Sequence, residues 1–288
     1  MSPVKEVSLV VAHEFKQVLL SVRSVLFFVV YGGISFIVGS SYTRVVSFFD
    51  KALAEQLGPV SGDDLANAGV SATKIFSELF EKDPELISVF GGQHVADALI
   101  SGQLPVVIFA WLVLSGWFLP SLLLVIGYDR ISEDLNGKFS RFVFLRLRRG
   151  TYLCGKIFAQ WLVAILLIAI VHGILLSLVS SHPSMKTSDV LSGAPYIWLG
   201  MTLYLLAYIS FTAVFSSSFT PPFAALALGL ICFMGLGIAS LSEAVKAVWM
   251  GDHSLQLWVG APGAYLLFLG HLVVWAGLAF MRLRTREI

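Results

Sequence analysis

The sequence has few charged residues and few cysteines. Asp, Glu, Lys and Arg make up 13% of its 288 residues, about half of the roughly 25% found in typical soluble domains. Hydrophobic residues make up 57%, and the mean hydropathy is +0.84. Both values are typical of a chain that crosses a membrane several times. Cys154 and Cys232, the two cysteines, lie in or beside apolar runs, so they indicate neither a disulfide framework nor a cysteine-based metal site.

Several catalytic motifs are also missing. The chain contains no G-x-x-x-x-G-K-[ST] phosphate loop, no H-E-x-x-H and no G-x-S-x-G. Gly155-Lys156 is followed by Ile157 and therefore lacks the Ser or Thr of a phosphate loop. His94, His182 and His253 are scattered over separate loops and do not by themselves predict a metal site. We therefore expect no enzyme activity, no cofactor, no metal and no nucleic-acid partner for this chain.

Long uncharged runs are abundant. A membrane helix needs about 20 apolar residues, and five uncharged runs reach that length: 24–43, 98–128, 157–185, 190–242 and 253–281. Within 190–242, the adjacent prolines Pro221 and Pro222 end one helix and begin the next. We therefore predict an all-α integral membrane protein with six spans in residues 23–288, at about 24–43, 104–127, 157–180, 195–215, 222–241 and 262–281.

Residues 1–22 have the pattern of an amphipathic helix on a membrane surface. Val4, Val7, Val11, Phe15 and Leu19 recur at helical spacing. Two acidic residues precede the first long apolar run, which disfavours a cleaved signal peptide. We expect this helix to be retained.

The basic residues predict an orientation. With both termini on the cytoplasmic side, 13 of the 19 Lys and Arg residues lie on that side and six on the other, as the positive-inside rule requires.

The outer side then has one long segment, 44–103. Its apolar residues recur at helical spacing, as in Phe49, Leu53 and Leu57. We interpret it as amphipathic helices resting on the outer membrane face. A small folded cap and a docking surface for a periplasmic partner are the alternatives.

Two histidines fall inside predicted spans, His172 and His271. Ionisable residues inside a membrane are candidates for a transport pathway. The alternative is a structural role, in which each ring bonds to a neighbouring helix.

The connector 128–156 concentrates charge, because it holds seven of the 19 Lys and Arg residues. It begins with an acidic turn and ends with a basic cluster followed by Gly155-Lys156, and Asn136-Gly137 lies between them. A plain positive-inside loop accounts for the basic residues but not for this order.

The order resembles the first cytoplasmic loop of ABC-2 type transporter permeases, the membrane subunits of one class of ABC transporter. Lys138 and Arg146 depart from that pattern, because they stand where the family usually has Thr and Pro. The matching positions are Asp129 at the end of the second span, Glu133 and Asp134 in a short acidic helix, Gly137 after it, Arg149 in the basic turn, and Gly155-Lys156 at the third span.

The resemblance extends to the other parts of the chain. Residues 1–22 are similar to the family's elbow helix, with Glu14 at its polar edge. The size of the chain and its long first outer loop are similar to the subgroup of copper-site maturation and gliding-motility permeases.

The resemblance implies a function and partners. The connector would contain a coupling helix that docks onto a separate ATPase subunit, which would bind the ATP. The implied partners are this ATPase, a second permease in a homo- or heterodimer, and membrane lipid, in the bacterial plasma (inner) membrane. The implied contact residues are Asp129, Glu133, Asp134, Gly137 and Arg149, with Glu14 of the elbow helix.

Two other functions stay open. One is a non-transporting scaffold or force-transmitting subunit that acts on an outer-face partner. The other is an integral membrane enzyme in which His172 or His271 is catalytic.

Overall fold

The computed structural model describes residues 3–57, 91–137, 144–180 and 194–286. In these ranges every regular element is a helix. Six of the helices are long and apolar enough to cross a membrane. The prediction of an all-α integral membrane protein with six spans is therefore confirmed, and the chain is a multi-pass membrane protein.

The spans are contained in six long helices. α2 (Val22–Leu57) follows the N-terminal helix α1 (Pro3–Leu19). The other five are α6 (Val106–Gly127), α9 (Arg149–Ser180), α11 (Ala194–Ser218), α12 (Pro222–Ala239) and α15 (Pro262–Thr285).

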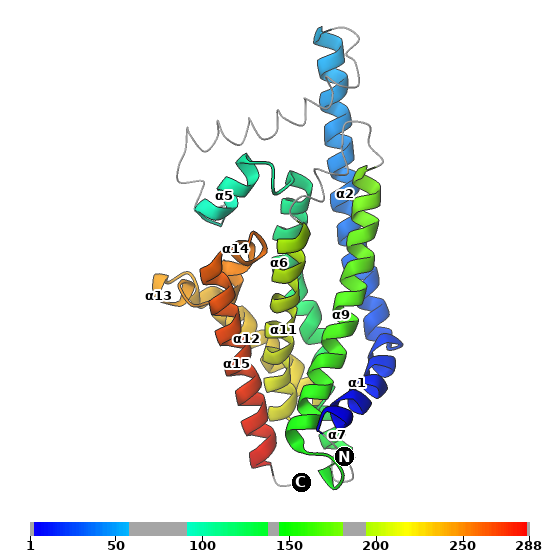
Figure 1. Cartoon of the computed structure of the whole chain (residues 1–288), viewed down its shortest axis with the longest axis vertical. Coiled ribbons are helices and arrows are strands. Elements are labelled where there is room, and N and C mark those ends of the chain that lie inside the picture. Colours follow the sequence, from blue (N-terminus) through cyan, green and yellow to red (C-terminus); the bar gives the residue numbers. More distant parts are fainter. Residues whose placement is uncertain (1–2, 58–90, 138–143, 181–193, 287–288) are drawn as a thin grey trace.

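Short helices connect the spans. α7 (Ser132–Asn136) follows α6. It lies at the same end of the bundle as both chain termini (Figure 1), and we call this end the terminal end. Toward the opposite end lie α5 (Gln93–Ile100), α13 (Glu243–Lys246), η1 (Met250–His253) and α14 (Ser254–Trp258).

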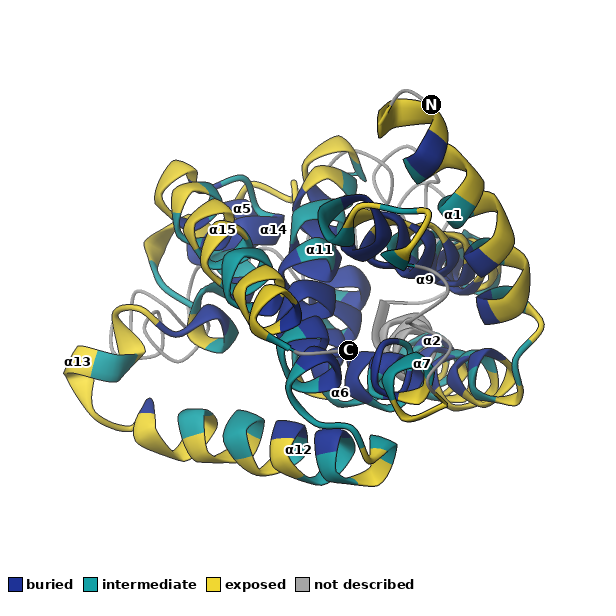
Figure 2. Cartoon of the chain, turned by 90° about the horizontal axis from the view of Figure 1, so that it is seen from below, coloured by how far each residue is buried: buried dark blue, intermediate teal, exposed yellow. Residues whose placement is uncertain are grey.

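Helix α11 forms the centre of the bundle. It packs against α15, α6 and α9, and more than half of its residues are buried. Helix α12 is peripheral: Figure 2 shows it at the edge of the bundle, and Ala225 and Gly229 are its buried residues. Exposure of so apolar a helix to water would be unfavourable, so lipid or another membrane helix must cover its outer surface.

Two helices, α2 and α9, extend beyond the predicted spans by two turns or more. α2 continues without a break to Leu57, because no glycine or proline follows Gly39 until Gly58. The first part of segment 44–103 therefore prolongs the span instead of forming a separate surface helix. Of the rest, α5 is described, whereas residues 58–90 lie outside the described ranges.

α9 begins at Arg149, two turns earlier than predicted. Gly150 and Gly155 do not break the helix, since a glycine inside a helix costs only about 1 kcal/mol relative to alanine. Lys156 is therefore a helical residue, and it is buried. Residues 138–143 of the connector lie outside the described ranges.

Candidate functional site

Helix α7 is attached to the centre of the bundle by Ser216. The backbone N–H groups of Ile131 and Ser132 donate hydrogen bonds of 2.9 and 3.2 Å to Ser216 Oγ on α11. The first N–H groups of a helix have no partner inside it. Ser216 supplies that partner and fixes where α7 begins.

Lys156 joins three segments at the terminal end. Its Nζ lies 3.0 Å from Glu14 Oε1 on α1 and 2.8 Å from Asp134 Oδ2 on α7. It also donates a 2.6 Å hydrogen bond to the carbonyl oxygen of Arg130, in the turn before α7. An ammonium group has three N–H donors, so three acceptors satisfy it. The Lys156 side chain is only 6% exposed.

The close approach of α1 to α9 depends on Gly155. A Cβ atom at position 155 would lie 2.5 Å from Val10 Cγ1 and 2.6 Å from Val10 Cβ. Only glycine permits this distance without movement of the backbone. The crossing places Glu14 beside Lys156. Tyr152, one turn earlier on α9, donates a 2.5 Å hydrogen bond to Asp134 Oδ2.

A second ion pair holds the turn before α7. Buried Asp129 pairs with Arg23 at the beginning of α2, and Arg23 also lies 4.8 Å from the centre of the Tyr128 ring. Arg130 Nε is 4.0 Å from Asp129 Oδ1, and Arg130 donates a 3.3 Å hydrogen bond to Ser21 Oγ.

We call these residues the terminal-end cluster. The negative charges of its three acidic side chains equal the positive charges of its three basic side chains. Its members come from α1, α2, α7, α9 and the turn between α6 and α7. They are Glu14, Arg23, Asp129, Arg130, Asp134 and Lys156. Because buried charges are tolerated only when they are paired, the cluster fixes the relative positions of these segments.

Arg149 binds the end of the last helix. Its Nη1 donates hydrogen bonds to the carbonyl oxygens of Leu283 (2.9 Å), Arg284 (2.6 Å) and Arg286 (3.3 Å). The last carbonyl groups of a helix have no partner inside it and carry partial negative charge. Arg149 therefore caps α15 with a cation.

The predicted contact residues separate into two groups. Glu14, Asp129, Asp134 and Arg149 are engaged in contacts within the chain. Glu133 and Gly137, by contrast, are exposed on and after α7. The sequence does not show the ionic partners of the three acidic residues in the first group, which are Lys156 and Arg23. A lysine beside a glycine at the start of an apolar run was the one available signal.

The two intramembrane histidines have separate surroundings. The ring of buried His172 on α9 is stacked between Trp111 and Trp198, with centroid distances of 4.7 and 5.4 Å. His271 on α15 is partly buried, and its Nδ1 lies 2.9 Å from the carbonyl oxygen of Leu267 in its own helix.

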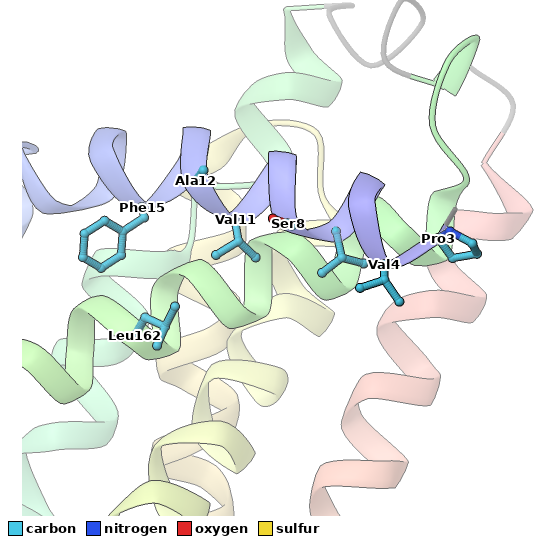
Figure 3. A pocket seen from close by; sticks show the side chains of 8 residues that line it. Pro3, Val4, Ser8, Val11, Ala12, Phe15 and Leu162 are labelled. Carbon is cyan, nitrogen blue, oxygen red and sulfur yellow. The ribbon is translucent and has the colours of Figure 1, made fainter. Parts of the chain in front are cut away.

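A groove lies between α1 and α9 (Figure 3). Its volume is about 1000 Å³, and its lining is apolar apart from Ser8. Val11 and Phe15 of α1 lie over Leu162 of α9. The remaining lining residues are Pro3, Val4, Val7 and Ala12. Such a lining suits hydrocarbon and offers no acid or base for catalysis.

Within the described ranges, no three His, Cys, Asp or Glu side chains are grouped so that they could bind a metal. His182, one of the three scattered histidines, lies outside these ranges.

Comparison of the sequence with protein-family models and with curated proteins gives no match.

Proposed function

We propose that the chain is the permease subunit of an ABC transporter of the ABC-2 type, driven by a separate cytoplasmic ATPase subunit. The observation that carries the proposal is α7 itself. It is a short acidic helix between two spans, it is anchored to several helices of the bundle, and it presents Glu133 outward. A helix that receives force from a partner needs both a free face and firm attachment.

The free face has groups that a protein partner can bind. Glu133 and Gly137 are exposed, and Leu145, in the second half of the connector beside Arg146, is 82% exposed. The anchored face consists of Asp134 and the turn from Asp129 to Ile131.

The distribution of basic residues supports a cytoplasmic terminal end. Both termini and α7 lie there (Figure 1), with 13 of the 19 Lys and Arg residues in the corresponding segments. By the positive-inside rule, this bias favours the cytoplasmic side, where ATP is present, for the terminal end. A bacterial plasma membrane is the proposed location.

The attachments suggest how movement reaches the spans. When the ATPase subunits close, α7 would be displaced. Ser216 would carry the displacement to the central helix α11, and Lys156 would carry it to α9. In this account the exposed faces of α12 and α15 are covered by lipid or by a second permease, and the groove on α1 accepts a lipid chain.

One observation favours a second candidate function. α2 continues for more than three turns after Arg44, the charged residue that ends its uncharged run 24–43. A rigid extension of a span would suit a subunit that transmits force to an outer-face partner without moving a substrate itself.

The enzyme alternative gains no support from the described residues. His172 contacts two aromatic rings, and His271 contacts a backbone carbonyl. Neither arrangement is a nucleophile–base pair.

Co-purification tests the proposal. A tag on this chain should retain a soluble subunit with a phosphate-binding loop, and the complex should hydrolyse ATP. Glu133→Lys should release that subunit or abolish the coupled ATPase activity. Glu243→Lys is the matched control, because Glu243 is equally exposed but lies on α13, toward the opposite end. A tagged chain that retains no ATPase, or a Glu133→Lys complex with parental activity, would contradict the proposal.

A further inference from the structure

We propose that Lys156 is a positioning residue that fixes α7 to α1, so that these helices and the first turns of α9 move as one unit. The inference deepens the proposed function, and it rests on that function only for the statement that α7 receives force. The structural claim itself concerns this chain alone.

Lys156 bonds to α1 and α7 at the same time. Glu14 of α1 and Asp134 of α7 both lie within hydrogen-bond distance of one nitrogen atom, Lys156 Nζ. The side chains of Glu14 and Asp134 are 11% and 23% exposed, so water screens their charges only in part. Without the ammonium group, two neighbouring carboxylates would repel each other. Lys156 therefore converts a repulsion between the two helices into an attraction.

Lys156 bonds to α1 and α7 directly, whereas the hydrogen bond from Tyr152 to Asp134 ties α7 only to α9. α1 packs mainly on α9, whereas α7 packs on α11 and α12. Two other contacts link the turn before α7 to the α1–α2 junction: Arg130 with Ser21 and Arg23 with Asp129. They reach Ser21, which lies between the two helices, and Arg23 at the start of α2, whereas Lys156 acts on α1 itself, at Glu14.

Helix α1 is a suitable arm for such a unit. It is one continuous helix of 17 residues, and Gly155 lets it pack closely on α9, with Val10 directly against the glycine. A displacement of α7 that moves Glu14 must therefore move the whole of α1. The elbow helix then becomes part of the moving machinery and is more than a membrane anchor.

Spin-label distance measurements on the full chain in lipid nanodiscs test the inference without any ATPase. Cys154 and Cys232 are first replaced by Ser. Labels are attached at Leu9→Cys on α1 and Asn136→Cys on α7, both of which are exposed positions. The parental lysine should give one narrow distance distribution. Lys156→Met, which keeps the length but removes the charge, should broaden it and shift it to longer distances.

Further variants separate the charge from simple packing. Lys156→Glu alone should broaden the distribution most, because three carboxylates would then meet. The exchange Glu14→Lys with Lys156→Glu puts the ammonium group on α1 and should restore the narrow distribution. Lys16→Met, an exposed lysine on α1, should leave it unchanged. If Lys156→Met fails to fold, Glu14→Gln removes only the ion pair between Lys156 and α1, and it should still broaden the distance distribution.

Two results would overturn the inference. One is a parental distribution in Lys156→Met or, if that variant does not fold, in Glu14→Gln. The other is a broadened distribution in Lys156→Glu that the charge exchange does not narrow. Because no ATPase is present, these results are independent of co-purification. If the measurements show the tie between α1 and α7 but co-purification retains no ATPase, only the proposed function fails.

Discussion

Gly155 of α9 faces Val10 of α1 so closely that a Cβ atom at position 155 would come within 2.5 Å of Val10 Cγ1. This contact brings α1 against the start of the third span. The next residue, Lys156, then reaches Glu14 and Asp134. The contacts of Lys156 in the terminal-end cluster thus depend on the absence of a side chain at position 155.

Gly155→Ala should destabilise the protein. The clash involves Val10 Cβ as well as a methyl group, so the backbone of α1 must move; overpacking of this kind costs about 1–3 kcal/mol. Thermal unfolding in detergent measures the loss. Gly173→Ala on the same helix is the control, because a Cβ there meets nothing within 4 Å, and it should leave stability equal or slightly higher. Equal unfolding temperatures for both variants would contradict the crossing.

Ser216→Ala should loosen α7. It leaves the N–H groups of Ile131 and Ser132 without their acceptor, at a cost of about 1–3 kcal/mol for an unsatisfied buried group. Hydrogen–deuterium exchange of residues 128–137 should accelerate. Ser218→Ala serves as the control, because its hydroxyl bonds to Val214 in its own helix. Unchanged exchange in Ser216→Ala would show that α7 is held by other contacts.

Asp129→Asn should destabilise the turn before α7. Arg23 would lose its ionic partner; because its side chain is 34% exposed, water partly replaces the lost contact, and we expect a loss of about 1–2 kcal/mol rather than the 3–5 kcal/mol of a fully buried pair. Unfolding in detergent checks this. A reversed pair, Arg23→Asp with Asp129→Arg, should recover part of the loss. No recovery would mean that the position of each charge matters more than the pair.

The substitution His172→Phe distinguishes a stacking role of His172 from a role in a transport pathway. If His172 serves to stack between Trp111 and Trp198, a phenyl ring should preserve both stability and function. His172→Ala should cost about 3 kcal/mol, since removal of a buried ring leaves a cavity. Loss of function with normal stability in His172→Phe would instead indicate a transport-pathway role for the imidazole.

The sequence predicted the spans well because a membrane helix is defined by its own composition. Runs without charge mark the six helices, and Pro221-Pro222 marks the break between α11 and α12. The end of α2 at Leu57 and the start of α9 at Arg149 were harder to predict. A charged residue marks where a helix leaves the membrane, but the helix itself can continue beyond it.

The candidate site was predicted only in part. The acidic residues of the connector stand out in the sequence, but what they contact depends on how α1, α2, α9 and α11 cross. Asp134 was expected to face a partner protein, whereas the structure pairs it with Lys156 and Tyr152. The stack around His172 joins three helices, and no local pattern announces it. Long-range contacts of this kind are decided by packing.

The central claim is that an ATPase docks on the exposed face of α7. A photo-cross-linking amino acid at position 133 tests it most directly, in membranes of cells that express this chain together with its native partners. The account predicts a covalent product with a soluble ATPase subunit from position 133 and none from position 243, which is equally exposed toward the opposite end. A product from neither position, or the same product from both, would contradict it.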